Sequence, residues 1–105
     1  MEISAQELKN KIQKGDKIIV DFWASWCGPC KMMKPMFENA SRNLMEQQSD
    51  VELFTLNVEE NREFIAELGI TSIPTIKGFA NGNVVFTEVG VKNTPTIMDM
   101  TKKLL

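Results

Sequence analysis

The chain contains 105 residues, of which 14 are Asp or Glu, 12 are Lys or Arg and none is histidine. The net charge of −2, without any Lys/Arg cluster, argues against nucleic acid or an anionic membrane as a partner. The apolar fraction of 43% is typical of a folded globular protein, and the length predicts one domain over residues 1–105. Without histidine, catalytic pairs of Ser or Cys with His and mixed Cys/His zinc sites are excluded.

The N-terminal region favours a cytoplasmic protein. Residues 1–7 are polar and acidic and lack the basic start and apolar run of a signal peptide, although a processed precursor would already have lost such a leader. No apolar run approaches the roughly 20 residues that a helix needs to span a bilayer. We therefore expect a cytoplasmic protein with no membrane partner. We also expect a monomer.

The first helix is predicted to follow Ser4, because Ser4 and Glu7 have the spacing of a capping box. Gly15 is a suitable C-terminal stop for this helix, and only residues 1–3 precede it, which predicts a shortened N-terminal strand. Residues 17–23 (KIIVDFW) are apolar and β-branched without clean alternation. That pattern is typical of a central strand covered on both faces.

A long helix is predicted over about residues 30–48, where apolar side chains recur at helical spacing. These side chains are Met33, Phe37, Ala40 and Leu44. Pro35 lies inside this segment, where it removes one backbone hydrogen bond and predicts a kink.

The second half of the chain predicts a strand over residues 51–58, a short helix over 59–68 and two more strands over 74–80 and 84–89. The last two strands flank the dipeptide Asn81-Gly82, which is the strongest short sequence signal for a tight hairpin. The chain therefore contains an antiparallel hairpin after its alternating helices and strands.

The last helix is predicted to have Thr94 as its N-cap and Pro95 at its first position. Ile97, Met100 and Leu104 give this helix an apolar stripe. Helices that alternate with strands, followed by a hairpin, predict an α/β fold with a mixed sheet.

The two cysteines, Cys27 and Cys30, lie in the sequence WCGPC between the central strand and the long helix. Two thiols at this spacing can close a disulfide and reopen it, which is a two-electron redox couple. In a reducing compartment such a pair is more often catalytic or metal-binding than structural. A Cys₄ zinc or iron–sulfur site needs four thiolates, so a metal would have to bridge two molecules. Thiol–disulfide exchange is the leading hypothesis.

The position of the two thiols predicts different roles. Cys27 is expected at the N-terminus of the helix, where unpaired backbone N–H groups and the helix dipole favour a thiolate. Pro29 is tolerated in the first helical turn, and Gly28 lets the backbone of a partner approach closely. Cys30 lies one turn further along and is expected to be less exposed. We therefore predict that Cys27 attacks a disulfide and that Cys30 resolves the mixed disulfide.

Asp21 lies in the middle of the apolar central strand, where an unpaired carboxylate is costly. Either the strand turns Asp21 toward solvent, or it buries a carboxyl with a raised pKa close to the thiols. In the second arrangement Asp21 accepts or donates the proton of Cys30.

Taken together, these motifs resemble the thioredoxin family, and the WCGPC sequence after the strand VDFWA is highly specific. The matching positions are 20–24, 26–31, Pro35, 69–70, 73–75, Phe79, 81–82 and Gly90, which cover nearly the whole chain. The resemblance implies the thioredoxin fold, with helices on both faces of a central mixed sheet. It also implies a protein-disulfide reductase that maintains redox balance and needs no bound cofactor.

The resemblance further implies partners and a docking surface. The clients would be proteins with disulfides, and thioredoxin reductase, a flavoprotein fed by NADPH in most systems, would recharge the pair. The Ile73–Pro74 bond would be cis and face the cysteines, so that Ile73 pairs with an extended client strand. Trp26, Ile73, Pro74 and Gly90 would form an apolar docking surface, and the kink at Pro35 would aim the active-site end of the helix.

Two positions depart from the family pattern. Thr55 stands where many members carry a lysine near the buried aspartate, so the pKa of Asp21 should be at least as high as in relatives. Lys77 interrupts a strand that is usually apolar. It either replaces the missing lysine from a neighbouring strand or is an ordinary solvated lysine.

Two other functions remain open at this point. An oxidant or isomerase on the same fold tends to carry histidine between its cysteines, and Gly28-Pro29 argues against that class. A binding subunit with incidental thiols would tolerate the replacement of both cysteines by serine.

Overall fold

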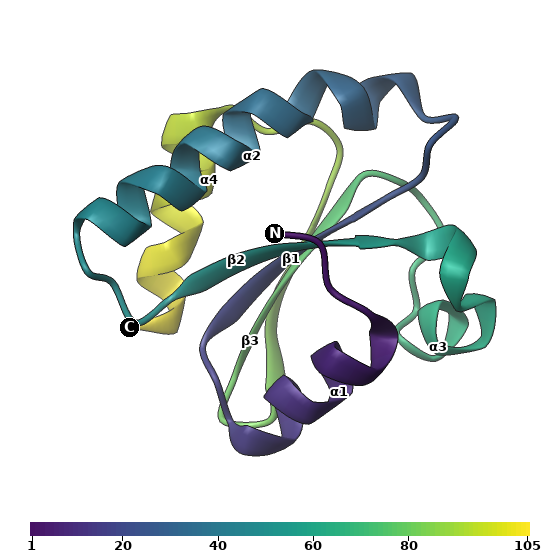
Figure 1. Cartoon of the computed structure of the whole chain (residues 1–105), viewed down its shortest axis with the longest axis horizontal. Helices are drawn as coiled ribbons and strands as arrows, with labels where there is room; N and C mark the ends of the chain where they lie inside the picture. Colours follow the sequence, from purple (N-terminus) through teal and green to yellow (C-terminus); the bar gives the residue numbers. More distant parts are fainter.

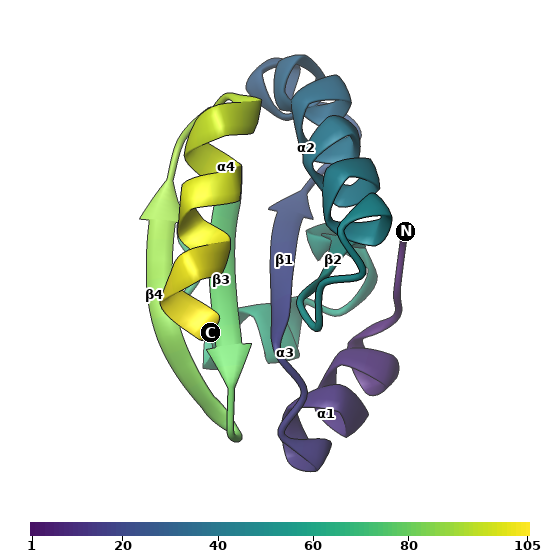
Figure 2. The same cartoon turned by 90° about the vertical axis from the view of Figure 1, so that its left-hand side faces the viewer.

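A four-stranded mixed sheet forms the centre of the computed structural model, which describes residues 1–105. The strands are β1 (Ile18–Trp23), β2 (Glu52–Asn57), β3 (Thr75–Ala80) and β4 (Asn83–Val89), and their order across the sheet is β2-β1-β3-β4. β1 runs parallel to β2. β3 runs antiparallel to both β1 and β4 (Figure 2). The predicted α/β fold with a mixed sheet is confirmed.

Helices cover both faces of the sheet. α2 (Gly28–Glu46) and α4 (Thr94–Thr101) lie on one face, while α1 (Ala5–Lys14) and α3 (Arg62–Glu67) lie on the other (Figure 1). A separate apolar cluster fills each interface. β1 contributes to both clusters, which explains why its sequence is apolar without alternation. None of the helices has the length and apolar character that crossing a bilayer would require.

The N-terminal segment behaves as predicted. Ser4 and Glu7 form the capping box of α1, and Gly15 ends the helix with a φ of 80°. The opening strand is reduced to a single parallel bridge between Glu2 and Thr55. Residues 1–3 therefore lie along the outer edge of β2.

The hairpin between β3 and β4 is also confirmed. Asn81 and Gly82 have φ angles of 55° and 82°, and positive φ at both central residues is what a type I′ turn requires.

Most predicted boundaries lie within two residues of the observed ones, and at two helices an asparagine acts as the N-cap where the sequence analysis placed none. Asn93, not Thr94, is the N-cap of α4, and it accepts a hydrogen bond from the backbone N–H of Thr96. The hydroxyl of Thr94 donates to the Met36 carbonyl, which ties α4 to α2. The helix predicted over residues 59–68 is interrupted at Asn61, which separates the 3₁₀ turn η1 (Val58–Glu60) from α3. A second 3₁₀ turn, η2 (Lys102–Leu104), follows α4.

Candidate active site

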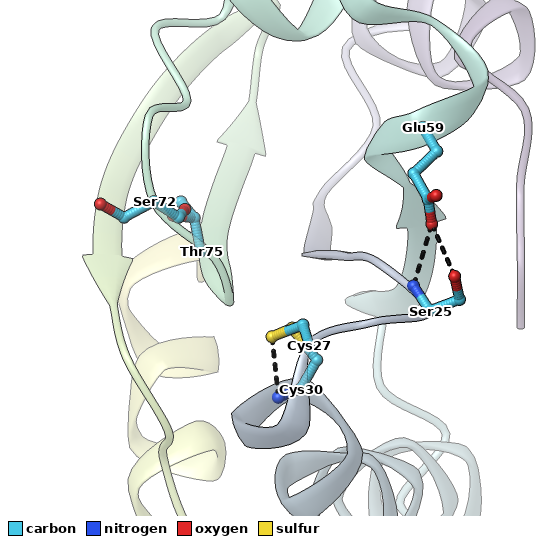
Figure 3. The surroundings of a disulfide bond; sticks show 6 residues. All are labelled: Ser25, Cys27, Cys30, Glu59, Ser72 and Thr75. Atoms are coloured by element: carbon cyan, nitrogen blue, oxygen red, sulfur yellow. Dashed lines mark hydrogen bonds between the residues drawn. A yellow bond between two sulfur atoms is a disulfide. The ribbon is translucent and has the colours of Figure 1, made fainter.

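The turn between β1 and α2 holds both cysteines. Cys27 is the N-cap of α2, Pro29 lies in the first helical turn, and Cys30 follows directly. The two sulfur atoms form a disulfide between Cα atoms 5.3 Å apart, so the structure represents the oxidised state (Figure 3). Pro35 lies inside α2, about two turns beyond Cys27, as the sequence predicts.

The start of α2 surrounds Cys27 with positive potential. The backbone N–H of Cys30 donates to Cys27 Sγ at 3.2 Å, and this contact is buried. Because this N–H has no carbonyl partner within the helix, it is available to a thiolate once the disulfide opens. The dipole of the 19-residue helix acts in the same direction.

Exposure does not distinguish the two cysteines, and the expectation that Cys30 is less exposed is wrong. Each residue is 4% exposed, because Cys27, Cys30 and Ala24 form one small cluster covered by neighbouring side chains. Their surroundings do differ. Cys30 lines a cavity of about 610 Å³, whereas Cys27 does not.

Asp21 lines the same cavity as Cys30. It is 3% exposed, so the alternative in which Asp21 faces solvent is wrong. Its Oδ1 atom is buried without a hydrogen-bond partner. Burial, and secondarily the negative charge of Glu2, raise the pKa of Asp21 to about 7. A carboxyl with this pKa can exchange a proton at neutral pH.

The position beside Asp21 carries no cation. Thr55 is the residue of β2 that pairs with Asp21. Its hydroxyl donates to the carboxylate of Glu2 at 2.6 Å. Sequence reasoning missed Glu2, because only the bridge between residue 2 and β2 brings it to this site.

Both readings of Lys77 are wrong. Lys77 pairs with Val20 of β1, so it lies on the opposite face of the sheet from Asp21 and cannot replace the missing lysine. It is also not solvated, since it is 7% exposed and donates to the Thr87 hydroxyl at 2.9 Å. Burial lowers the pKa of the Lys77 ammonium.

A second contact that the sequence did not reveal holds the turn before Cys27. Glu59 Oε1 accepts hydrogen bonds from both the backbone N–H and the hydroxyl of Ser25, at 3.0 and 2.9 Å (Figure 3). These two donors hold the pKa of Glu59 below its usual value. The contact links η1 to the active-site turn.

The loop before β3 faces the cysteines from the other side. The Ile73–Pro74 bond is cis, as the family resemblance implies, and the Ile73 side chain packs against the cluster that contains the disulfide. The N–H of Gly90 donates to the Pro74 carbonyl at 2.9 Å, which joins this loop to the end of β4.

The expected docking residues differ in exposure. Trp26 is 70% exposed, while Ile73 and Gly90 are half-buried. Pro74 is fully buried, so it supports the loop from beneath and offers no area to a client.

Comparisons with known proteins agree with this geometry. The model of the family described as Thioredoxin matches residues 1–103. Thioredoxin of Rickettsia typhi is 40% identical over 96 residues, covering 90% of this chain and 89% of that protein. Thioredoxin of Rickettsia prowazekii is 37% identical over 102 residues, covering 96% and 94%. Among solved structures, Plasmodium falciparum thioredoxin aligns with a TM-score of 0.82 and 32% identity, over 97% of this chain and 95% of that one.

Proposed function

Because the chain belongs to the thioredoxin family, we propose that Cys27 is the nucleophile and Cys30 the resolving thiol of its reaction. The chain is a dithiol–disulfide oxidoreductase, and its clients are proteins that contain disulfides. The observation that carries the assignment is the hydrogen bond from the Cys30 N–H to Cys27 Sγ at the start of α2. This donor would stabilise a thiolate on Cys27.

The reaction proceeds in two exchanges. The Cys27 thiolate attacks one sulfur of the client disulfide, that S–S bond breaks, and the other client sulfur leaves as a thiolate that takes up a proton. The Cys30 thiolate then attacks Cys27 Sγ in the mixed disulfide and releases the second client sulfur. The client gains two electrons and two protons, and the Cys27–Cys30 disulfide forms.

Asp21 would manage the proton of Cys30. The Cys30 thiol must lose its proton before the second exchange, and Asp21 lines the same cavity. With a pKa of about 7, the carboxylate form of Asp21 is populated at neutral pH and accepts that proton. The cavity supplies the path by which the proton then reaches solvent.

Client docking would use the exposed ring of Trp26 and the backbone of Ile73. Neither the N–H nor the C=O of Ile73 has a hydrogen-bond partner in the chain. Both groups are therefore available to an extended client segment, which would pair with the loop as an added strand. Gly90 would border this segment, and Pro35 would set the direction of the active-site end of α2.

The oxidised pair must be reduced again for the next cycle. We assign this step to thioredoxin reductase, which would pass two electrons from NADPH through its flavin, and we place the cycle in the cytoplasm. The protein would act as a monomer with one domain over residues 1–105.

Trapping tests the two roles. Cys30→Ser should accumulate mixed disulfides through Cys27 when mixed with a peptide that contains a single disulfide, because the second exchange is lost. Mass spectrometry of the adduct identifies the linked cysteine. The matched variant Cys27→Ser should form none. Adducts on Cys30 of the Cys27→Ser variant, with none on Cys27 of the Cys30→Ser variant, would reverse the assignment.

A further inference from the structure

Glu2, Thr55 and Asp21 form one row across the sheet. The bridge pairs Glu2 with Thr55, and the register of β1 and β2 pairs Thr55 with Asp21. Residues paired in this way point to the same face of a sheet. The N-terminal segment runs beside β2 (Figure 1), and Glu2 lines the cavity that contains Asp21 and Cys30.

The Glu2 carboxylate is held in place by three donors. Its Oε1 atom accepts from the Trp23 indole N–H at 2.8 Å and from the Thr55 hydroxyl at 2.6 Å, and its Oε2 atom accepts from the Asn57 N–H at 2.8 Å. Backbone hydrogen bonds of Thr55 to residues 1 and 3 fix the segment on both sides of Glu2. Glu2 acts only as an acceptor in these contacts, which suits an ionised carboxylate.

This arrangement affects Asp21 in two ways. The Thr55 hydroxyl has one hydrogen and donates it to Glu2, so this hydroxyl does not donate to Asp21, whose Oδ1 atom has no hydrogen-bond partner. The negative charge of Glu2 also disfavours a second negative charge on Asp21.

Other charged groups face the same cavity from the N-terminus and from α2. These groups belong to the lining residues Lys31, Lys34, Glu38 and Arg42, and to Met1, which lines the cavity and carries the N-terminal ammonium. Among all of these groups, Glu2 is the one whose charge contributes to the raised pKa of Asp21. Lys77 of β3 lies on the other face and does not take part.

We propose that Glu2 is a positioning residue for the redox reaction, which acts on Asp21 by placing a negative charge beside its cavity and by taking the hydrogen of Thr55. The proposal rests on the proton-transfer role of Asp21 given above. It assigns the N-terminal segment a part in the chemistry, although this segment contains no group that touches the reacting sulfurs.

Three variants separate the two routes, and each is compared with the wild type by the ¹³C titration of the Asp21 carboxyl in the oxidised protein. Glu2→Gln removes the charge but keeps an oxygen for Thr55, and should lower the Asp21 midpoint by about half a pH unit. Glu2→Ala also frees the Thr55 hydroxyl to donate to Asp21, so it should lower the Asp21 midpoint further than Glu2→Gln does. Adding Thr55→Val to Glu2→Ala should return the midpoint to that of Glu2→Gln.

A control variant tests whether the loss of any other carboxylate near β2 also shifts the Asp21 midpoint. Glu52→Gln removes the same charge from the exposed start of β2, outside the cavity, and should leave the midpoint unchanged. Thermal unfolding of each variant verifies that the fold is kept. Equal Asp21 midpoints in the wild type, Glu2→Gln and Glu2→Ala would overturn the proposal.

The kinetic readout separates this proposal from the role of Asp21. The rate at which Cys30 resolves a preformed mixed disulfide should have an acid limb that moves to lower pH by the same amount as the Asp21 midpoint. If the midpoint moves and the acid limb does not, the action of Glu2 on Asp21 stands and the proton-transfer role of Asp21 is wrong.

Discussion

Asp21 and Lys77 are both buried in the same sheet, on neighbouring strands and opposite faces. Burial disfavours the charge on each, so it raises the pKa of Asp21 and lowers that of Lys77. Lys77 donates a hydrogen bond to Thr87, whereas Asp21 Oδ1 has no hydrogen-bond partner. Asp21 also lines the same cavity as Cys30. A perturbed pKa is therefore common to both residues, and a shared cavity with Cys30 is what distinguishes Asp21.

The largest effect is expected for Asp21→Asn, which should slow the resolution of mixed disulfides about 100-fold at pH 7, because the proton acceptor is lost. Stopped-flow fluorescence with a preformed mixed disulfide measures this step.

The same substitution should stabilise the fold above pH 7 by up to about 4 kcal/mol, since each unit of pKa difference corresponds to about 1.4 kcal/mol.

The sign of the stability effect follows from linkage. The folded state keeps a proton on Asp21 up to pH about 7, while the unfolded state releases it near the ordinary value of 3.8. The contribution of Asp21 to the stability of the wild type therefore falls as pH rises from about 4 to about 7. This pH dependence should be absent in Asp21→Asn when denaturant melts are recorded across that range. An unchanged slope would show that Asp21 titrates normally in the folded state.

The two residues also show what the sequence could and could not predict. The place of Asp21 in an otherwise apolar strand left two alternatives, and burial is the one that the structure shows. The position of Cys27 followed from a strand that runs directly into a helix. The face of Lys77 depended on the register between β1 and β3, where a shift of one residue exchanges the two faces. Local patterns do not contain that information.

Contacts between segments that are distant in the sequence could not be predicted either. Glu2 accepts hydrogen bonds from residues of β2 that are more than 50 positions away in the sequence. The single β-bridge that brings them together has no hydrophobic pattern from which it could be predicted. The equal exposure of Cys27 and Cys30 depends on covering side chains such as Ile73. At α4, Asn93 and Thr94 are both capable N-caps, and the contact of Thr94 with α2 decides between them.

Thr87→Val should leave Lys77, like Asp21 Oδ1, without its side-chain hydrogen-bond partner, because the substitution removes the hydroxyl that accepts from the Lys77 ammonium. We expect a loss of about 1 kcal/mol in the free energy of unfolding at pH 7, the usual cost of leaving one buried donor without its partner. Urea denaturation measures this loss. The rate of disulfide reduction should stay the same, and a slower rate would mean that this side of the sheet influences the active site.

The smallest effect is expected for Lys77→Met, which keeps the length of the side chain and removes its charge. The rate of disulfide reduction should stay within about twofold of the wild type, since Lys77 lies on the face away from the cavity.

The Lys77→Met variant should be slightly more stable than the wild type at pH 7, because the cost of burying the ammonium is gone. With a lowered pKa in the folded state, the wild type regains this stability as pH rises toward the unfolded pKa of 10.5, so the difference between the two proteins should vanish there. Denaturant melts at pH 7 and pH 10.5 measure this difference in the free energy of unfolding. A large loss of activity in Lys77→Met, with its fold intact, would mean that a buried charge on either face affects the thiols, and the distinction between Asp21 and Lys77 would fail.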